Sequence, residues 1–169
     1  MDSDVLPWLE YHWAFDFPLG MFRAILERLR GTPARLEELL LGVSDARLMT
    51  RHRGRWSAKE HAGHLWTVDA LWHTRIGEYL RGAQELTAAD LANRATGAAA
   101  YDDRPGGEIM GGFRTARTHT LALLDPLSPA DAARVAHHPR LNRPMRLVDL
   151  CYFAAEHDDH HLALIRELV

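Results

Sequence analysis

Two histidines near the end of the chain, His157 and His161, have the type and spacing of a metal-binding pair. Side chains four residues apart on an α-helix project from the same face, one turn from each other. The residues around them recur with a helical period and form one inward stripe, made of Leu150, Phe153, Ala154, His157, His161, Leu164, Ile165 and Leu168. Because imidazole nitrogens are common ligands of divalent ions, this pair predicts part of a metal site.

A second histidine cluster lies much earlier in the chain. Ser57 and Glu60 form the capping-box pattern that is typical of a helix N-terminus, so a helix is expected to begin here. On that helix His61 and His64 both fall on the inward arc. Either imidazole could supply a third nitrogen, which is the ligand number of sites that keep one position open for water or substrate.

Other readings of these residues remain open. His157 and His161 could be core histidines satisfied by neighbouring side chains, although a metal would explain both, because unpaired buried polar groups are costly. His160 flanks the stripe, which favours a surface or supporting position. Asp158 with His161 is similar to the carboxylate and histidine pattern of di-metal bundles, but the second such motif is missing. The His157-Asp158 dipeptide also occurs in HD phosphohydrolases, whose further ligands are absent at the required spacings.

Four long helices must position these histidines. The first is expected to start near Asp16 and Pro18, to be kinked by Pro33, and to end at Gly42. The second follows Ser57. The third carries a stripe from Ile109 to Leu127, and the fourth runs from about Arg146 to the end of the chain.

The segments between the long helices are expected to be short helices and loops. Short helices are predicted over Ala88–Arg94 and near Asp131, and a loop with two prolines over 137–144. Residues 1–15 are an aromatic lead-in, and no strand is predicted. The sequence therefore predicts an all-α, four-helix bundle that forms a single domain over residues 1–169.

Composition excludes several classes of protein. The 169 residues carry a net charge of −3, which argues against binding to nucleic acid, and the only cysteine, Cys151, excludes an intrachain disulfide. No apolar run approaches the ~20 residues of a membrane span, and the start Met1-Asp2-Ser3-Asp4 lacks the features of a signal peptide. We therefore expect a cytoplasmic protein. Trp66, on the outward face of its helix, is a candidate dimer surface.

Two motifs in this chain resemble those of a known family. The segment from Trp56 to Leu65 is similar to the W-S-x-x-E-x-x-x-H-L signature of the DinB/YfiT-like superfamily, and His157 to Leu162 is similar to its late H-D-x-x-H-L element. The order of elements agrees from Phe22 to Ile165. The resemblance implies a four-helix bundle with long crossover connections and one divalent ion, zinc or nickel among others, held by His64, His157 and His161.

The resemblance also implies a choice of reactions on a small-molecule substrate. Similar proteins include thiol S-transferases that use low-molecular-weight thiols, with the ion stabilising a thiolate as the nucleophile. A water in the same position would give a hydrolase. A non-catalytic bundle with a structural ion or a ligand pocket is the remaining alternative. We expect a thiol S-transferase that acts without nucleic acid or membrane partners and that could form a homodimer.

Overall fold

The computed structural model describes residues 4–169, so Met1, Asp2 and Ser3 of the predicted lead-in lie outside the described residues. Four long helices form the bundle, which confirms the predicted all-α fold: α1 (Phe22–Leu40), α3 (Ala58–Leu80), α5 (Gly106–Leu124) and α7 (Leu147–Leu168). None of the described helices is both long and apolar enough to cross a membrane.

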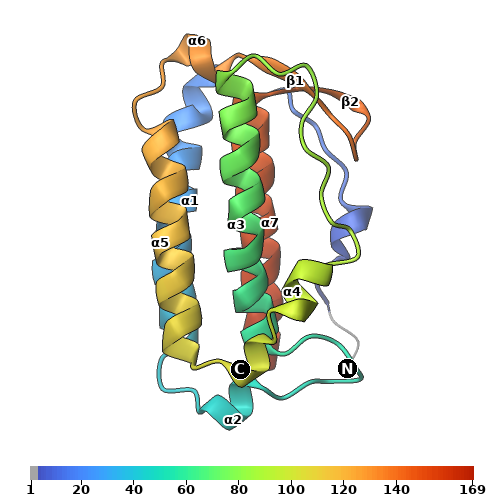
Figure 1. Cartoon of the computed structure of the whole chain (residues 1–169), viewed down its shortest axis with the longest axis vertical. Coiled ribbons are helices and arrows are strands. Elements are labelled where there is room, and N and C mark those ends of the chain that lie inside the picture. Colours follow the sequence, from blue (N-terminus) through green and yellow to red (C-terminus); the bar gives the residue numbers. More distant parts are fainter. Residues whose placement is uncertain (1–3) are drawn as a thin grey trace.

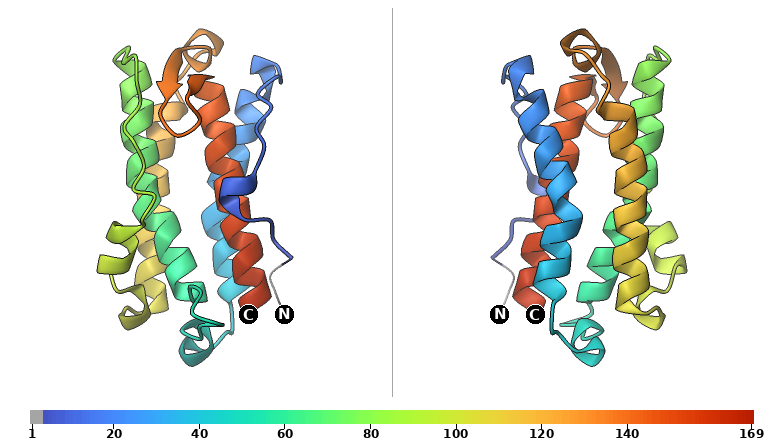
Figure 2. Two further views of the ribbon diagram at one scale, coloured as in Figure 1. Left: turned by 90° about the vertical axis from the view of Figure 1, so that its right-hand side faces the viewer. Right: turned by 90° about the vertical axis from the view of Figure 1, so that its left-hand side faces the viewer.

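The helices are connected by crossovers. α1 packs against α5 and α7, and α3 packs against the same two helices, so α1 and α3 lie diagonally opposite each other. Figure 1 shows α1 and α7 running downward and α3 and α5 running upward. The parallel pair α3 and α5 therefore needs a long return connection, which descends over residues 81–105 beside α3 (Figures 1 and 2).

Short elements fill the ends and the connections of the bundle. They are η1 (Trp8–Glu10), η2 (Leu19–Met21), α2 (Asp45–Leu48), α4 (Arg94–Ala98), η3 (Tyr101–Asp103), α6 (Pro129–Ala132), β1 (Val135–His138) and β2 (Arg143–Arg146). The helical turn expected near Asp131 is confirmed. The helix expected over Ala88–Arg94 is wrong, because the side chain of Asp90 instead accepts from the N–H of Ala95 and precedes a helix that begins at Arg94.

The prediction that the chain has no strand is also wrong. β1 and β2 form an antiparallel hairpin, with Val135 opposite Arg146 and His138 opposite Arg143. Each strand has four residues, and their histidines, arginines and proline give little alternation of apolar and polar side chains. The hairpin is held to the long connection by backbone hydrogen bonds, in which His137 N–H donates to Gln84 O and Leu86 N–H donates to His137 O.

The N-terminus of α1 differs from the prediction, whereas its C-terminus agrees with it. The helix begins at Phe22, after the η2 turn, and no side chain caps it, so the cap expected at Asp16 is wrong. Pro18 instead initiates the η2 turn. Gly42 ends the helix as predicted, with a positive φ of 75° that glycine adopts without strain.

α1 continues through Pro33, and a side chain from another helix replaces the lost backbone hydrogen bond. Proline has no N–H to donate to the carbonyl of Leu29, four residues earlier. Arg117 Nη1, from α5, donates to that carbonyl over 2.8 Å. The neighbouring Thr32 Oγ1 lies 3.1 Å from the Arg28 carbonyl oxygen. The proline therefore creates a polar docking point for Arg117 inside the bundle.

Arg117 is the centre of a buried ionic network that joins all four long helices. Its Nε lies 2.6 Å from Asp69 Oδ2 on α3, and its Nη1 lies 2.6 Å from Asp158 Oδ2 on α7. Thr120 Oγ1 donates to Asp69 over 2.5 Å, and Thr32 Oγ1 donates to Asp158 over 2.9 Å. Because Asp158 is directed at Arg117, the rotation of α7 about its axis is fixed, and His157 is directed elsewhere.

Candidate metal centre

The three histidines singled out by the sequence lie together in the structure. His64 from α3 and His157 and His161 from α7 are 8%, 5% and 6% exposed, and one ring nitrogen of each lies within 4.8 Å of the others. On α7, His157 and His161 lie between Ala155, the last residue of this helix in one apolar cluster, and Leu162, the first residue of this helix in the other. The two histidines therefore occupy a gap between the apolar clusters.

The spacing of the ring nitrogens suits one divalent ion. His64 Nε2 and His157 Nε2 lie 3.3 Å apart. Two nitrogens that are each ~2.0–2.1 Å from one zinc ion in tetrahedral geometry would be about 3.3–3.4 Å apart. The arrangement of these two imidazoles, with His161 beside them, thus resembles that of a ligand set.

Hydrogen bonds on the far side of two rings leave their other nitrogens free for an ion. His64 Nδ1 is 2.9 Å from Thr96 Oγ1 of α4, and His161 Nδ1 is 2.9 Å from His61 Nδ1. When Nδ1 of His64 or His161 carries the proton, the lone pair of its Nε2 is available. His157 Nδ1 is buried and has no partner among residues 4–169, so neighbouring side chains do not fully satisfy this histidine.

The protein environment keeps these imidazoles neutral, which is the form that binds a metal. Burial, with His160 as a further cause, lowers the pKa of His64 to about 4. Burial and the neighbouring histidines lower the pKa of His157 and of His161 well below the usual value. The pKa of His61 falls to about 3, first through burial and then through His64 and His160.

The other residues that the sequence offered near the metal site lie outside the group of three histidines. His61 bonds to His161 and so lies one step behind the cluster. Asp158 is held by Arg117 and Thr32 and is not a member of the close group, which removes the carboxylate-ligand alternative. Glu60 accepts from Ser57 N and from Arg51, so its capping role is confirmed and it does not reach the histidines.

Trp66 does not form the exposed surface that the sequence suggested. Its ring packs on Gly112 of α5, where a Cβ would lie 2.5 Å from the indole, and it contacts Tyr101 and Arg104. The prediction that it faces outward is wrong, because Gly112 brings α5 close enough to cover it. Trp66 therefore gives no support to the expectation that the chain forms a homodimer.

Local packing brings α4 to the histidines. Tyr101 of η3 lies flat against Gly63 of α3, where any Cβ would approach its ring to 2.1 Å. Tyr101 Oη and Thr67 Oγ1 share a hydrogen bond of 2.8 Å. This contact anchors the long connection on α3 next to His64, and so places Thr96 within reach of the imidazole.

A cavity of about 410 Å³ adjoins the histidine cluster. Its walls come from α3, α7, the long connection, the hairpin and the N-terminal segment, and its aromatic lining residues are Trp8, Trp56, Trp72 and Phe153. Trp8 and Trp72 contact the ring of His157 at centroid distances of 5.1 and 5.7 Å. His160 also lines the cavity, and its Nδ1 is buried without a partner in the described part of the chain.

Sequence reasoning missed several of these residues. Thr96, Trp8 and Arg140 lie in segments without helical periodicity, so no pattern placed them near the histidines. Cys151 faces the core on α7, and burial raises the pKa of its thiol to about 12. The chain therefore offers no reactive thiol of its own.

The sequence and the fold of this chain are similar to those of known proteins. Residues 28–165 match the model of the DinB superfamily. Among solved structures, YfiT from Bacillus subtilis, which is described as a probable metal-dependent hydrolase with an unusual four-helix bundle topology, is similar with a TM-score of 0.81. It is 20% identical, and the match covers 94% of this chain and 91% of that chain. Among curated protein sequences no significant match is found.

Proposed function

This chain belongs to the DinB superfamily, and on that premise we propose that it is a metal-dependent enzyme whose divalent ion is bound by His64, His157 and His161. The reaction that we propose is transfer of a low-molecular-weight thiol to an electrophilic small molecule. A cytoplasmic location suits this reaction, because thiols are kept reduced there.

The observation that carries the proposal is the approach of three buried imidazole nitrogens to within 4.8 Å beside a cavity. Structural zinc sites are usually closed by four protein ligands, whereas three ligands leave a position for an exchangeable group. A zinc or nickel ion bound there would lower the pKa of a thiol or a water in that position. All-imidazole coordination suits either metal.

The surrounding residues support thiol chemistry. Trp8, Trp72 and Phe153 form apolar walls of the cavity, and such walls would limit the access of water to the reacting atoms. Burial lowers the pKa of His160, so its neutral ring could accept a proton. In the proposed transfer, sulfur forms a bond to the electrophilic carbon, the thiol proton passes to His160, and the leaving group takes the electron pair and then that proton. Cys151 is too deeply buried to be the nucleophile.

Hydrolysis is the second candidate, and the description of YfiT as a probable metal-dependent hydrolase favours it. A hydrolase normally needs a carboxylate or a histidine that activates water. Among the described cavity residues the one carboxylate is Asp90, which accepts from the N–H of Ala95 and lies 3.5 Å from Arg94. Asp90 is thus occupied at the end of α4, so His160 would have to activate the water, and the apolar walls of Trp8, Trp72 and Phe153 favour thiol transfer over hydrolysis.

A screen of several thiols against several electrophiles tests the proposed reaction. We expect the metal-loaded protein to accelerate at least one transfer, and a chelator to abolish this activity while the helical circular dichroism stays largely unchanged. The helicity should survive because the apolar core on both sides of the histidines does not depend on the ion. Activity that persists without metal would contradict the proposal, and hydrolysis without transfer would favour the second candidate.

The hydrogen bond from Thr96 to His64 predicts a specific effect on metal affinity. Thr96→Val keeps the shape of the side chain but removes the hydroxyl that orients the imidazole. Loss of such a supporting hydrogen bond typically weakens metal binding by ~10–100-fold. Competition with a fluorescent chelator measures the affinity, and Thr74→Val, an exposed position on α3, is the matched control. Equal affinities in the two variants would show that Thr96 does not support the site.

A further inference from the structure

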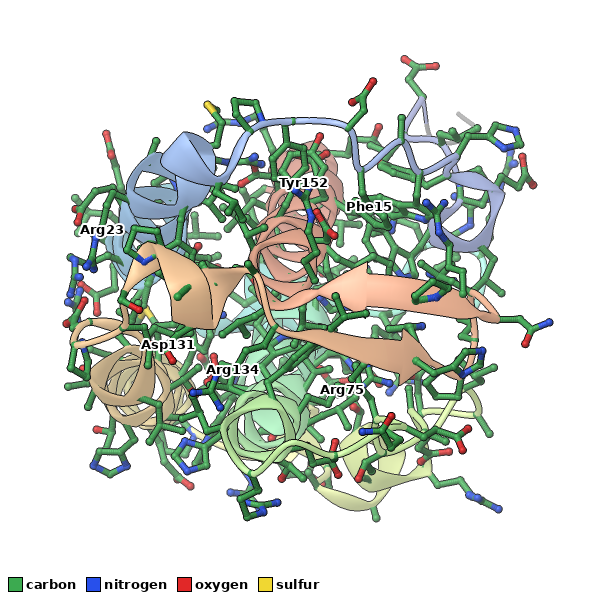
Figure 3. All side chains as sticks on the ribbon, turned by 90° about the horizontal axis from the view of Figure 1, so that it is seen from above. Phe15, Arg23, Arg75, Asp131, Arg134 and Tyr152 are labelled. Carbon is green, nitrogen blue, oxygen red and sulfur yellow. The ribbon has the colours of Figure 1, made fainter. Side chains whose placement is uncertain are left out.

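Two arginines line the cavity without a carboxylate partner. Arg75 comes from α3, and Arg140 comes from the turn between β1 and β2. Neither forms an ion pair with any residue in the range 4–169, and Nη2 of each is buried without a hydrogen-bond partner there. Figure 3 shows Arg75 extending from α3 beneath the hairpin. Buried N–H donors without partners are costly, so these two Nη2 groups need an explanation.

The other contacts of Arg75 fix its position but do not satisfy it. The side chain is 1% exposed; Nε donates to Thr87 O over 2.9 Å, and Nη1 is 3.1 Å from His138 Nε2. His138 Nδ1 also faces a donor, the N–H of Leu141 at 3.2 Å. A neutral imidazole has only one acceptor nitrogen, so His138 can satisfy only one of these donors. Burial lowers the pKa of Arg75 to about 10, which leaves it charged at neutral pH.

Arg140 is held by aromatic rings. Its guanidinium carbon lies 5.7 Å from the ring centre of Trp8 and 5.2 Å from that of Phe153. Contacts with ring faces position the charge but do not use its N–H donors. The carboxylate of Asp90, also in the cavity wall, is engaged by the N–H of Ala95. The two guanidinium groups are therefore charged groups of the cavity that have no ion-pair partner within 4 Å among residues 4–169.

The same aromatic residues connect the arginines with the histidine cluster. Trp8 contacts both Arg140 and His157, and Trp72 contacts both Arg75 and His157. Phe153 lies one helical turn before His157 on α7, which corresponds to ~6 Å along the helix axis. A ligand that spans from the guanidinium groups to the histidines would thus lie against an apolar, aromatic wall.

We propose that Arg75 and Arg140 bind the carboxylate of the substrate, whose apolar body lies against Trp8, Trp72 and Phe153. Each unpartnered Nη2 could donate to one oxygen of a carboxylate, whereas a phosphate would leave its remaining oxygens against apolar walls. The placement of a reactive atom at the histidines rests on the proposed function, but the carboxylate site itself requires no metal.

Quenching of tryptophan fluorescence tests this site, because Trp8, Trp56 and Trp72 line the cavity. The metal-loaded protein is titrated with 3-phenylpropionate, with the uncharged 3-phenylpropionamide, and with inorganic phosphate. We expect 3-phenylpropionate to bind at least about tenfold more tightly than the amide or phosphate, because hydrogen bonds between ions are the strong ones.

Variants locate the binding and separate it from the metal. Arg140→Met should weaken binding of 3-phenylpropionate at least about tenfold. This variant is preferred to Arg75→Met, since Arg75 also holds the connection through Thr87. Arg143→Met, an exposed position on the same hairpin, should leave binding unchanged.

The His161→Ala variant distinguishes a carboxylate held by arginine from one held by the ion. It should retain binding within about threefold even if it loses its metal, since the charge-assisted hydrogen bonds come from arginine. Loss of binding in His161→Ala but not in Arg140→Met would overturn the carboxylate site and leave the proposed function intact. Equal binding of 3-phenylpropionate and its amide would overturn it as well.

Discussion

Untagged protein carrying His161→Ala is expected to bind divalent metal more than about 100-fold more weakly than the native chain, since loss of a direct ligand should exceed the 10–100-fold cost of losing a supporting residue. His64→Ala should have the same effect, because these imidazoles belong to the close group of ring nitrogens. Thiol-transfer activity should be lost together with the ion. Metal content by mass spectrometry and affinity by chelator competition measure both effects.

Two controls sharpen this prediction. His61→Ala removes a histidine that contacts His161 through Nδ1 but is not in the close group, so it should weaken metal binding by ~10–100-fold and not abolish it. His73→Ala removes an exposed imidazole from the same helix and should change nothing. Full metal occupancy in both His64→Ala and His161→Ala would refute the assigned ligands. Loss of the metal in His61→Ala and His161→Ala, but not in His64→Ala, would exchange the roles of His61 and His64.

Replacing Arg117 with methionine is expected to lower the free energy of unfolding by about 3–5 kcal/mol, because it leaves two carboxylates buried without their cation. Asp69 and Asp158 are 1% and 0% exposed, and both lie 2.6 Å from the guanidinium. The carbonyl of Leu29 also loses the donor that replaces the missing N–H of Pro33. Urea denaturation followed by circular dichroism measures the change.

Arg114→Met on the same helix is the matched control. Arg114 forms an exposed ion pair with Glu37, with an N···O distance of 2.6 Å and side chains 49% and 41% exposed. Such surface pairs contribute ~0–1 kcal/mol. A similar loss of stability in the two variants would mean that the buried network does not hold the helices together.

Periodicity and capping were sufficient to predict the bundle. The stripe of α7 and the capping box at Ser57 placed two helices and turned His64, His157 and His161 toward the interior, and the structure brings these three together. The orientation of α3 and α7 about their own axes was predictable because each helix carries an apolar stripe along one side. The hairpin was not, because Val135–His138 and Arg143–Arg146 are too short and too polar to show a strand pattern.

The features that could not be predicted from the sequence depend on contacts between segments that are distant in the chain. Asp158 stands beside His157 in the sequence, yet its partner is Arg117 on another helix, and nothing in the local pattern identifies that pairing. The preference for His64 over His61 depended on the family motif, and in the structure it is His64 that lies in the close group with His157 and His161. Arg140, in an irregular turn, had no signal at all.

The central claim is that the histidines from α3 and α7 hold one divalent ion. Metal analysis of the native chain, purified without a histidine tag and dialysed against metal-free buffer, tests it most directly. The expected result is about one zinc or nickel ion per chain, in keeping with a single three-histidine site. A chain that retains no divalent ion, and takes up none when zinc or nickel is supplied, would contradict it.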